Sequence, residues 1–160
     1  MVMISVRCKE PGDQPWVDGV LRGMWGGRTV VVHGEAFDAG ALPALIAGDC
    51  VGLATFALAP ARRYAELVTL NALVARQGVG TALLDSLADR LKASGIGQIR
   101  LTMTNDNLDA LRFYQRRGFH IAAVRPGAVD QARRIKPSIP MVGNYGIARH
   151  DEIEMMRVLG

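Results

Sequence analysis

A short segment with two glycines, Val74–Leu84, constrains the fold of this 160-residue chain more than any other part of it. It follows an apolar run that favours a strand, and it leads into an amphipathic pattern that predicts a helix. Gly78 and Gly80 lie at the junction, where the absence of a Cβ lets the backbone approach a ligand closely. Unpaired N–H groups and the positive end of the helix dipole attract anions there, so the segment predicts a phosphate site.

Two common phosphate motifs do not fit these residues. A dinucleotide fingerprint needs a third glycine three residues after Gly80, and Leu83 stands at that position. A P-loop needs Gly-Lys-Ser/Thr, whereas Gly80 is followed by Thr81. A Gly-x-Gly pair alone is a weak signal, so a tight turn before a helix remains the alternative interpretation.

Length and composition favour one folded domain that spans residues 1–160, because 49% of the residues are hydrophobic. No apolar run approaches the roughly 20 residues of a membrane span, and charged residues interrupt Met1–Glu10, so we expect neither a membrane segment nor a signal peptide but a cytoplasmic protein. Cys8 and Cys50 lie in apolar runs and are predicted to be buried and reduced. The three histidines lack metal-ligand spacing, so no metal site is predicted.

The formal charge of +4 is modest and favours an anionic ligand. Most basic residues are scattered along the chain, and the one dense cluster, Arg133–Lys136, is short. We interpret that cluster as a solvated helix face and predict no nucleic-acid partner.

Hydrophobic periodicity gives the order β-α-β-β-β-α-β-α-β, which predicts an α/β domain of α+β type with a mixed sheet. The predicted helices are 13–24, 79–94 and 108–117, and the predicted strands are 3–8, 28–33, 50–58, 64–73, 99–103 and 119–124, with 153–158 as a candidate last strand beyond this order. Strands 50–58 and 64–73 are expected to pair as a hairpin. Residues 42–47 are predicted to form a helical turn or a loop, and residues 125–150 a long connection rich in proline and glycine.

A second motif, Asn105–Phe119, resembles the second signature of the GNAT N-acetyltransferases, in which an asparagine, a small residue and an aromatic pair precede Gly-Phe. The matching residues are Asn107, Ala110, Phe113, Tyr114, Gly118 and Phe119. Gln77–Thr81 resembles the acetyl-CoA pyrophosphate loop of the same family, and a strand separates the two motifs in the expected order. The resemblance covers roughly residues 50–124. It departs from the family at Ala75, where an Arg or Gln is usual, and this leaves the role of Arg76 open.

The resemblance implies a GNAT fold, with a mixed, mostly antiparallel sheet flanked by helices and splayed strands that form an acetyl-CoA cleft. It implies that amides of Gln77–Ala82 hold the pyrophosphate, that the pantetheine arm pairs with Thr69–Leu73, and that a backbone N–H near Leu73 meets the oxyanion. A Cβ at Gly78 or Gly80 would collide with the phosphates. The implied cofactor-binding residues are Leu70, Ala72, Leu73, Val74, Arg76, Gln77, Gly78, Val79, Gly80, Thr81, Ala82, Asn107, Ala110, Phe113 and Tyr114.

Acetyl transfer to an amine requires removal of a proton, because an alkylamine with a pKa near 10.4 is mostly protonated at pH 7. The resemblance implies that Glu66 is the base and that Tyr114 protonates the leaving thiolate. The alternatives are an outward-facing strand charge for Glu66 and a core aromatic for Tyr114. Phe113 is expected in the core, and Asn107 caps its helix, binds the pantetheine arm, or does both. Less well placed candidates for the base are Glu35, Asp38, His120 and His150.

The predicted function is therefore that of an acyltransferase, an N-acetyltransferase that moves an acetyl group by direct attack from acetyl-CoA to a primary amine of a small molecule or peptide. The alternatives are a non-catalytic CoA-binding sensor or regulatory module, and a partner of the same fold in a larger assembly. Both monomer and homodimer remain open. Residues 13–25 and 125–150 are expected to shape the acceptor end, and the latter to gate it. Four side chains are expected either to line that end or to pack: Trp16, Trp25, Tyr145 and His150.

Overall fold

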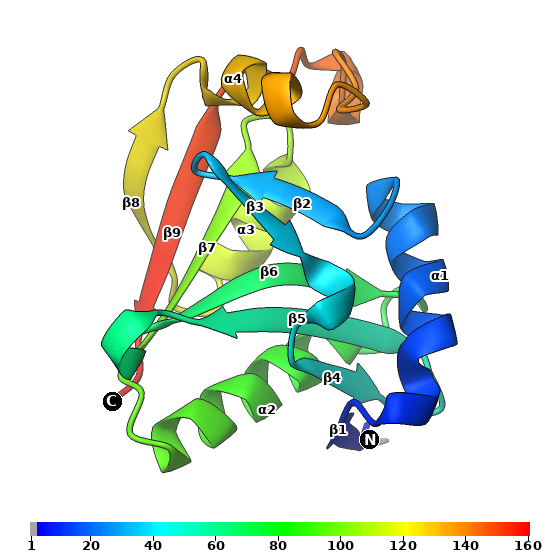
Figure 1. Ribbon diagram of the computed structural model, residues 1–160. Helices are drawn as coiled ribbons and strands as arrows, with labels where there is room; N and C mark the ends of the chain where they lie inside the picture. Colours follow the sequence, from blue (N-terminus) through cyan, green and yellow to red (C-terminus); the bar gives the residue numbers. More distant parts are fainter. Residues whose placement is uncertain (1–2) are drawn as a thin grey trace.

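A seven-stranded sheet forms the centre of the computed structural model, which describes residues 3–160 (Figure 1). In spatial order the strands are β1 (Val6–Cys8), β4 (Ala44–Ala47), β5 (Gly52–Leu58), β6 (Ala65–Ala72), β7 (Gln98–Thr104), β9 (Glu152–Val158) and β8 (His120–Arg125). All neighbours pair antiparallel except β6 and β7, which are parallel. A separate hairpin consists of β2 (Thr29–Val32) and β3 (Glu35–Asp38).

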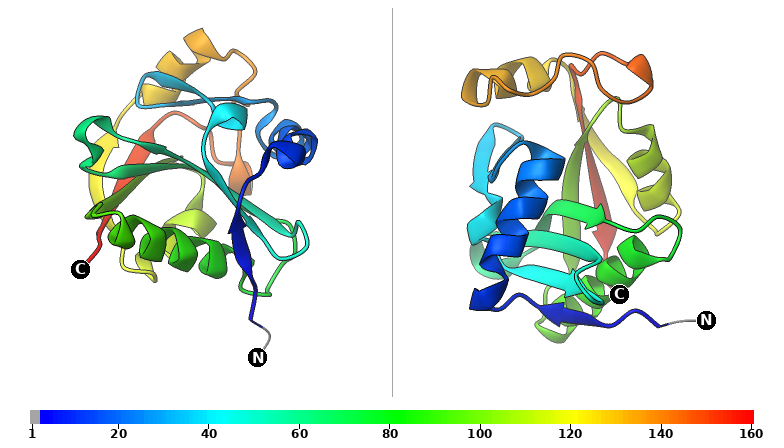
Figure 2. Two further views of the ribbon diagram at one scale, coloured as in Figure 1. Left: turned by 60° about the horizontal axis from the view of Figure 1, so that its bottom comes forward. Right: turned by 90° about the vertical axis from the view of Figure 1, so that its right-hand side faces the viewer.

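Within residues 3–160, four α-helices accompany the sheet: α1 (Gln14–Trp25), α2 (Val79–Ala93), α3 (Leu108–Gln115) and α4 (Ala128–Ile135). Figure 2 shows α1 and the β2–β3 hairpin on one face of the sheet and α2 and α3 on the opposite face. Each face has its own apolar cluster, because side chains along a strand point alternately to the two sides. Leu83, Leu87 and Leu91 of α2 pack in one cluster, and Val17 and Leu21 of α1 pack in the other.

The strands β6 and β7 diverge, and this divergence opens the sheet at its centre. They pair only from Ala65–Leu67 to Ile99–Leu101, at the start of β6. Immediately afterwards β6 carries a bulge at Val68, because Thr55 and Phe56 of β5 face Thr69 and Leu67. A bulge bends its strand and increases the local twist. The rest of β6 therefore turns away from β7 and leaves one edge of its backbone without a strand partner.

The fold class predicted from the sequence is confirmed, a mixed and mostly antiparallel sheet flanked by helices with two splayed strands. Helices α1, α2 and α3 lie at the predicted positions, and β5 and β6 form the predicted hairpin. The assignment of residues 42–47 to a helical turn or loop is wrong, since Ala44–Ala47 is the strand β4. This strand is buried on both faces, so its residues show none of the alternation that marks a half-exposed strand. The short strand β3 was not predicted either.

Two other predictions need correction. Cys8 is exposed, at the end of the edge strand β1, and Cys50 is half-buried, so an apolar neighbourhood in sequence did not ensure burial; both thiols are free. Residues 125–150 are not one irregular connection, because they contain α4, which begins after Gly127 in a left-handed conformation (φ 72°).

Across residues 3–160, none of the helices combines the length and the apolarity needed to cross a membrane.

Candidate active site

The start of α2 presents free backbone donors to a pocket. Gly78 is the N-cap residue, with φ 74°, and its lack of a side chain leaves the helix start uncapped. The amide of Ala82 donates to the Gly78 carbonyl at 2.9 Å, so Val79, Gly80 and Thr81 are the residues whose N–H groups have no partner inside the helix. The pocket beside them has a volume of about 250 Å³. It has the donors that a phosphate group needs.

Helix packing explains why residue 80 is a glycine, whether or not a ligand is bound. A Cβ at this position would lie 3.2 Å from the ring of Phe113 on α3, so α2 and α3 approach closely here. Phe113 is half-buried beside the pocket rather than fully in the core. Backbone conformation explains why residue 78 is a glycine, because its φ lies in the left-handed region that residues with a side chain rarely adopt.

Arg117 is a pocket residue that the sequence reasoning missed. Its guanidinium lies over the ring of Phe113, 3.7 Å from the centroid. Its Nε donates to the hydroxyl of Thr81 at 2.9 Å and one terminal nitrogen donates to the carbonyl of Phe113 at 2.9 Å. Two of five N–H donors are used in this way, so the remaining three are available to a ligand. The signal in the sequence that points to Arg117 is its place directly before Gly118 and Phe119, which follow α3.

The free edge of β6 carries the backbone groups of Leu70 and Ala72, and the amide of Leu73 is not among its free donors. The N–H of Leu73 donates to the carbonyl of Val51 at 2.8 Å, so Leu73 itself is not free to meet an oxyanion, and the predicted donor near it must be a neighbouring amide. Because hydrogen-bonded and non-hydrogen-bonded pairs alternate in an antiparallel ladder, the backbone groups of Leu70 and Ala72 point the other way. They face the side from which β7 has diverged.

Glu66 lies on β6 in the last stretch that still pairs with β7, and its side chain is only 7% exposed. Its carboxylate contacts Nε2 of His33 at 2.6 Å. His33 belongs to the turn of the β2–β3 hairpin, so Glu66 points to the face that carries this hairpin. Burial raises the pKa of Glu66 above its ordinary value, and His33 opposes this increase. The negative charges of Glu154 and Glu35 raise the pKa further.

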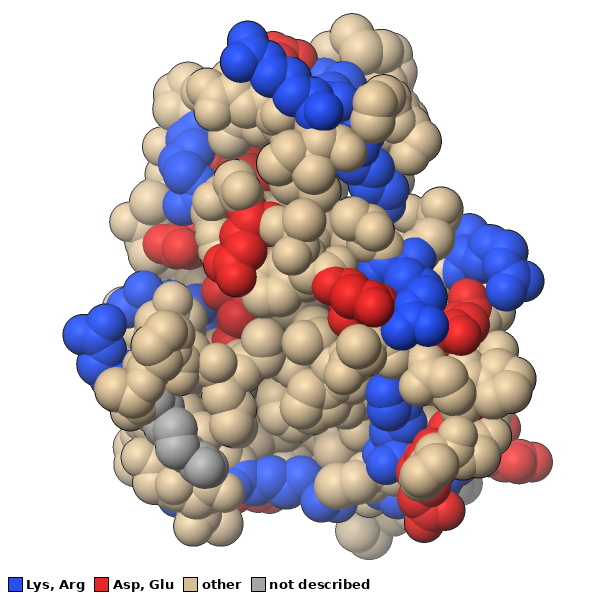
Figure 3. All heavy atoms as spheres, in the orientation of Figure 1, with Lys and Arg blue, Asp and Glu red and all other residues tan. Residues whose placement is uncertain are grey.

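Charged residues of β8 and β9 surround this pair. The backbone N–H of His33 donates to Glu152 of β9 at 3.0 Å, and Glu152 also accepts from Arg125 of β8 at 3.3 Å. Arg125 lies 3.6 Å from the carboxylate of Glu154. Figure 3 shows acidic side chains gathered left of centre on this face, beside the hairpin turn. The site next to Glu66 is therefore rich in carboxylates, and Arg125 balances two of them.

Tyr114 and Asn107 occupy the opposite face of the sheet. Tyr114 is 9% exposed and packs edge-to-face between Phe113 and Phe119, with ring centroids 5.2 and 5.3 Å away. Burial raises the pKa of its hydroxyl, so this group stays protonated at neutral pH. The side chain of Asn107 accepts from the N–H of Ala110 at 3.2 Å, which confirms its predicted role as the cap of α3.

The pocket brings together eight of the predicted cofactor-binding residues. They are Ala72, Val74, Arg76, Gly78, Val79, Gly80, Thr81 and Phe113, and the pocket also contains Ala75 and Arg117. Seven predicted residues do not line it, namely Leu70, Leu73, Gln77, Ala82, Asn107, Ala110 and Tyr114. Of these, Leu70, Ala110 and Tyr114 pack against the apolar cluster under α2, next to the opening between β6 and β7.

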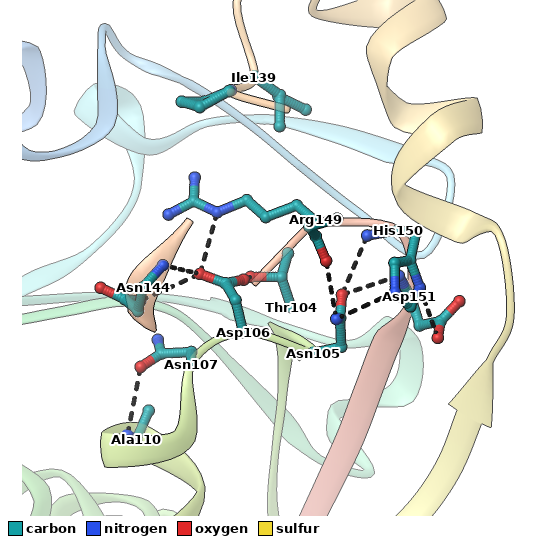
Figure 4. Close-up of polar contacts among 12 residues, drawn as sticks. Thr104, Asn105, Asp106, Asn107, Ala110, Ile139, Asn144, Arg149, His150 and Asp151 are labelled. Atoms are coloured by element: carbon teal, nitrogen blue, oxygen red, sulfur yellow. Dashed lines mark hydrogen bonds and ion pairs between the residues drawn. The ribbon is translucent and has the colours of Figure 1, made fainter. Parts of the chain in front are cut away.

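Residues 136–150, which we call the roof segment, lie at the top of Figure 1 and are tied to the start of α3. Asp106 is fully buried and accepts hydrogen bonds from the backbone and side chain of Asn144 at 2.9 and 3.1 Å and from Nε of Arg149 at 3.1 Å (Figure 4). The Thr104 hydroxyl donates to the same carboxylate. A Cβ on Gly143 would collide with Asp106 and Arg149, which explains why this close approach needs a glycine.

The roof segment also contacts the other face of the sheet. Nζ of Lys136 donates to the carbonyls of Trp25, at the end of α1, and Thr29, at the start of β2, at 2.7 and 2.6 Å. Arg133 donates to carbonyls of the roof segment and is 12% exposed. The interpretation of Arg133–Lys136 as a solvated helix face is therefore wrong for these two side chains, which fasten the segment.

The four side chains expected at the acceptor end have different surroundings. Trp25, the last residue of α1, donates from Nε1 to Asn71 of β6 at 2.7 Å, and both Trp25 and Trp16 pack against the apolar cluster on the hairpin face. The hydroxyl of Tyr145 donates to Asp109 at 2.6 Å, and its ring is exposed. His150 pairs with Asp151 at 2.7 Å. Trp25 thus contacts β6 beyond its bulge, through Asn71.

The region that contains the uncapped helix start, the adjoining pocket and the splayed strands lies mostly within a segment that matches a known protein family. The family profile described as "Acetyltransferase (GNAT) family" matches residues 16–119. The chain belongs to the GNAT acetyltransferase family. It is an acetyl-CoA-dependent N-acetyltransferase, as the sequence motifs indicated.

Individual proteins are similar to this chain in sequence or in fold. The chain is 39% identical over 112 residues to the uncharacterized protein YdhI of Bacillus subtilis (strain 168), which corresponds to 70% of this chain and 69% of that protein. The ribosomal-protein-S18-alanine N-acetyltransferase of Escherichia coli has a similar fold, with a TM-score of 0.68, 19% identity and coverage of 99% of this chain and 95% of that one. A GNAT family acetyltransferase of Elizabethkingia anophelis, solved with acetyl-CoA bound, has a TM-score of 0.66, 16% identity and 98% coverage of both chains.

Proposed function

We propose that this protein acetylates a primary amine of a small molecule or peptide, with Glu66 as the base and Tyr114 as the acid. One observation carries the proposal: a buried carboxylate with a raised pKa lies where β6 and β7 begin to separate. The two groups lie on opposite faces of the sheet, so the amine would approach from the hairpin face and the thiol would leave on the α2 face.

The residues around the pocket fit acetyl-CoA. The free amides of Val79–Thr81 and the unused donors of Arg117 would hold the pyrophosphate, and Arg76, exposed at the rim, would add a second positive charge. The backbone groups of Leu70 and Ala72 would pair with the pantetheine amides and orient the thioester carbonyl. Acetyl-CoA supplies an activated acetyl group in this arrangement, and the protein positions it.

Glu66 would remove the proton from the amine, directly or through a water molecule. A general base works best when its pKa approaches the pH at which it acts, and burial moves the pKa of Glu66 in that direction. The carboxylates of Glu35 and Glu154 nearby would attract the protonated amine to the site. Tyr114, which stays protonated, would donate a proton to the departing thiolate.

The alternative proposal is a CoA-binding sensor that has lost catalysis. It would need the pocket beside α2 but not the Glu66–His33 contact on the other face. The presence of both favours an enzyme. We further propose a cytoplasmic location and one acetyltransferase domain, as monomer or homodimer.

The experiment is an acceptor screen with acetyl-CoA and a panel of amines: spermidine, L-lysine, L-glutamate, an aminoglycoside and a peptide with a free N-terminal alanine. Thiol release is followed in wild-type protein and in Glu66→Gln. We expect turnover of at least one amine and a fall in kcat of about 10²–10⁴-fold in the variant, because a general base contributes about that factor. Binding of acetyl-CoA without turnover of any amine would favour the sensor, and equal rates in both proteins would refute the role of Glu66.

A further inference from the structure

We propose that His33 is the residue through which the proton taken up by Glu66 leaves the active site. The inference rests on the proposed function, since it requires Glu66 to act as the base. His33 does not contact the reacting atoms in this scheme, so it is a positioning and relay residue rather than a catalytic one.

The overall reaction defines what such a relay must do. A protonated primary amine and a thioester become an amide and a free thiol, while an N–C bond forms and the C–S bond breaks. The ammonium group loses two protons, of which one ends on the thiol sulfur. One proton per turnover must therefore reach the solvent, and Glu66 must lose it before the next amine binds.

Glu66 is poorly placed to release that proton by itself, because its side chain is only 7% exposed. Its Oε1 lies 2.6 Å from Nε2 of His33, which is 24% exposed. The other ring nitrogen of His33 lies 3.9 Å from Oε2 of Glu35, which is 62% exposed. Exposure thus rises along the three residues from the base to the surface. An imidazole can accept a proton on one nitrogen and release another from the second, as a relay requires.

The hairpin turn holds His33 in this position independently of its ring. The backbone N–H of His33 donates to Glu152, and Arg125 binds the same carboxylate. The ring also packs edge-to-face against Phe37 of β3, with centroids 6.0 Å apart. Removal of the imidazole therefore leaves the backbone anchor of the turn in place.

The turn itself suggests the best test variant. His33 (φ 42°) and Gly34 (φ 78°) form a two-residue connection between Val32 and Glu35, with positive φ at both positions. Asparagine followed by glycine is the preferred pair in such a turn. His33→Asn therefore suits the backbone and removes the proton carrier, and His33→Gln gives a second side chain that cannot relay a proton.

The groups that face the pair define the electrostatic background of the test. They come from β3, β7, β8 and β9, and they are Glu35, Arg100 at the position beside Glu66, Arg125, Glu152 and Glu154. None of them changes in the variants. The matched control is His120→Asn, which removes a histidine from the exposed start of β8.

The experiment measures kcat and both KM values for acetyl-CoA and the most reactive amine of the panel, with and without added imidazole. We expect both His33 variants to lose about 10–100-fold in kcat, with KM for acetyl-CoA within about twofold, because a proton transfer is affected and cofactor binding is not. Free imidazole should restore part of the loss in His33→Asn but none in Glu66→Gln. His33→Asn/Glu66→Gln should be no slower than Glu66→Gln alone, since both act on one proton path.

The outcomes separate this inference from the proposed function. If no amine is acetylated by the wild-type protein, the proposed function fails and the relay fails with it. If amines are acetylated and Glu66→Gln is inactive, while both His33 variants keep the wild-type kcat, only the relay is refuted. A lower kcat that imidazole does not restore in His33→Asn would mean that His33 merely holds the hairpin, and this also refutes the relay.

Discussion

The two faces of the opening between β6 and β7 are built in different ways. On the α2 face, the pocket consists of ten residues, eight of them between Ala72 and Thr81 in the sequence, and its main donors are backbone amides. On the hairpin face, the charged site combines His33, Glu66, Arg125 and Glu152, which belong to four separate strands or turns. One face is a local structure made by the backbone, and the other is a tertiary structure made by side chains.

This difference indicates which part of such an enzyme tolerates change. Backbone donors at a helix start depend on the glycines and the course of the chain, so most side-chain substitutions nearby leave them intact. A cluster of charges far apart in sequence depends on each side chain separately. We expect the α2 face to carry the function that members of this family share and the hairpin face to carry the choice of acceptor.

The largest expected effect tests the α2 face. Gly80→Glu places a side chain against Phe113, 3.2 Å from the Cβ position, and a negative charge among the free amides. We expect acetyl-CoA affinity to fall more than about 100-fold, because the anion site is both filled and neutralised. Calorimetric titration measures this loss, with Gly97→Glu as the control at an open position. Affinity within about tenfold of wild type would mean that the pocket does not hold the phosphates.

The next effect tests how the roof segment supports the hairpin face. Asp106→Asn replaces an acceptor of four hydrogen bonds with an amide whose NH₂ opposes the donors of Asn144 and Arg149. We expect the free energy of unfolding to fall by about 2 kcal/mol at pH 7, since a buried charged acceptor is lost. The KM for the amine should rise more than the affinity for acetyl-CoA falls. Urea denaturation and steady-state kinetics measure the two effects.

The pH dependence of Asp106→Asn gives an internal check. Burial opposes ionisation, but the Thr104 hydroxyl, the Asn144 amide and Arg149 together hold the pKa of Asp106 below its ordinary value. A lowered pKa contributes stability that is present above the unfolded value of about 3.9 and is lost as the pH falls through the folded value. The difference in stability between wild type and variant should therefore narrow below about pH 4. A constant difference down to pH 3, or an equal loss in the exposed control Asp85→Asn, would contradict this explanation.

The smallest expected effect tests the side-chain contribution on the α2 face. Arg117→Gln removes the guanidinium that stacks on Phe113 and binds Thr81. We expect acetyl-CoA to bind about tenfold more weakly, which corresponds to about 1.4 kcal/mol. Arg116→Gln, one residue away and exposed, serves as the control. A similar loss in both variants would indicate a general effect of charge instead of a specific contact.

Much of the fold could be predicted from the sequence, and the failures have two physical causes. The helices α1, α2 and α3 each have a polar and an apolar side, so their period is visible in the residues. The strand β4 is buried on both faces, so its period disappears. The fastening role of Lys136 was missed because its partners, the carbonyls of Trp25 and Thr29, lie more than 100 residues earlier in the chain.

The candidate site also has one part that could be predicted from the sequence and one part that could not. The glycine segment Val74–Leu84 and the motif Asn105–Phe119 indicated the family and the position of the pocket beside α2, because a strand–turn–helix junction is made by neighbouring residues. Tertiary structure alone decided that Arg117 reaches the pocket, that the Leu73 amide is already bonded, and that His33 contacts Glu66. Adjacent residues determine local backbone geometry, whereas contacts between side chains far apart in the sequence form only when the sheet and the hairpin pack together.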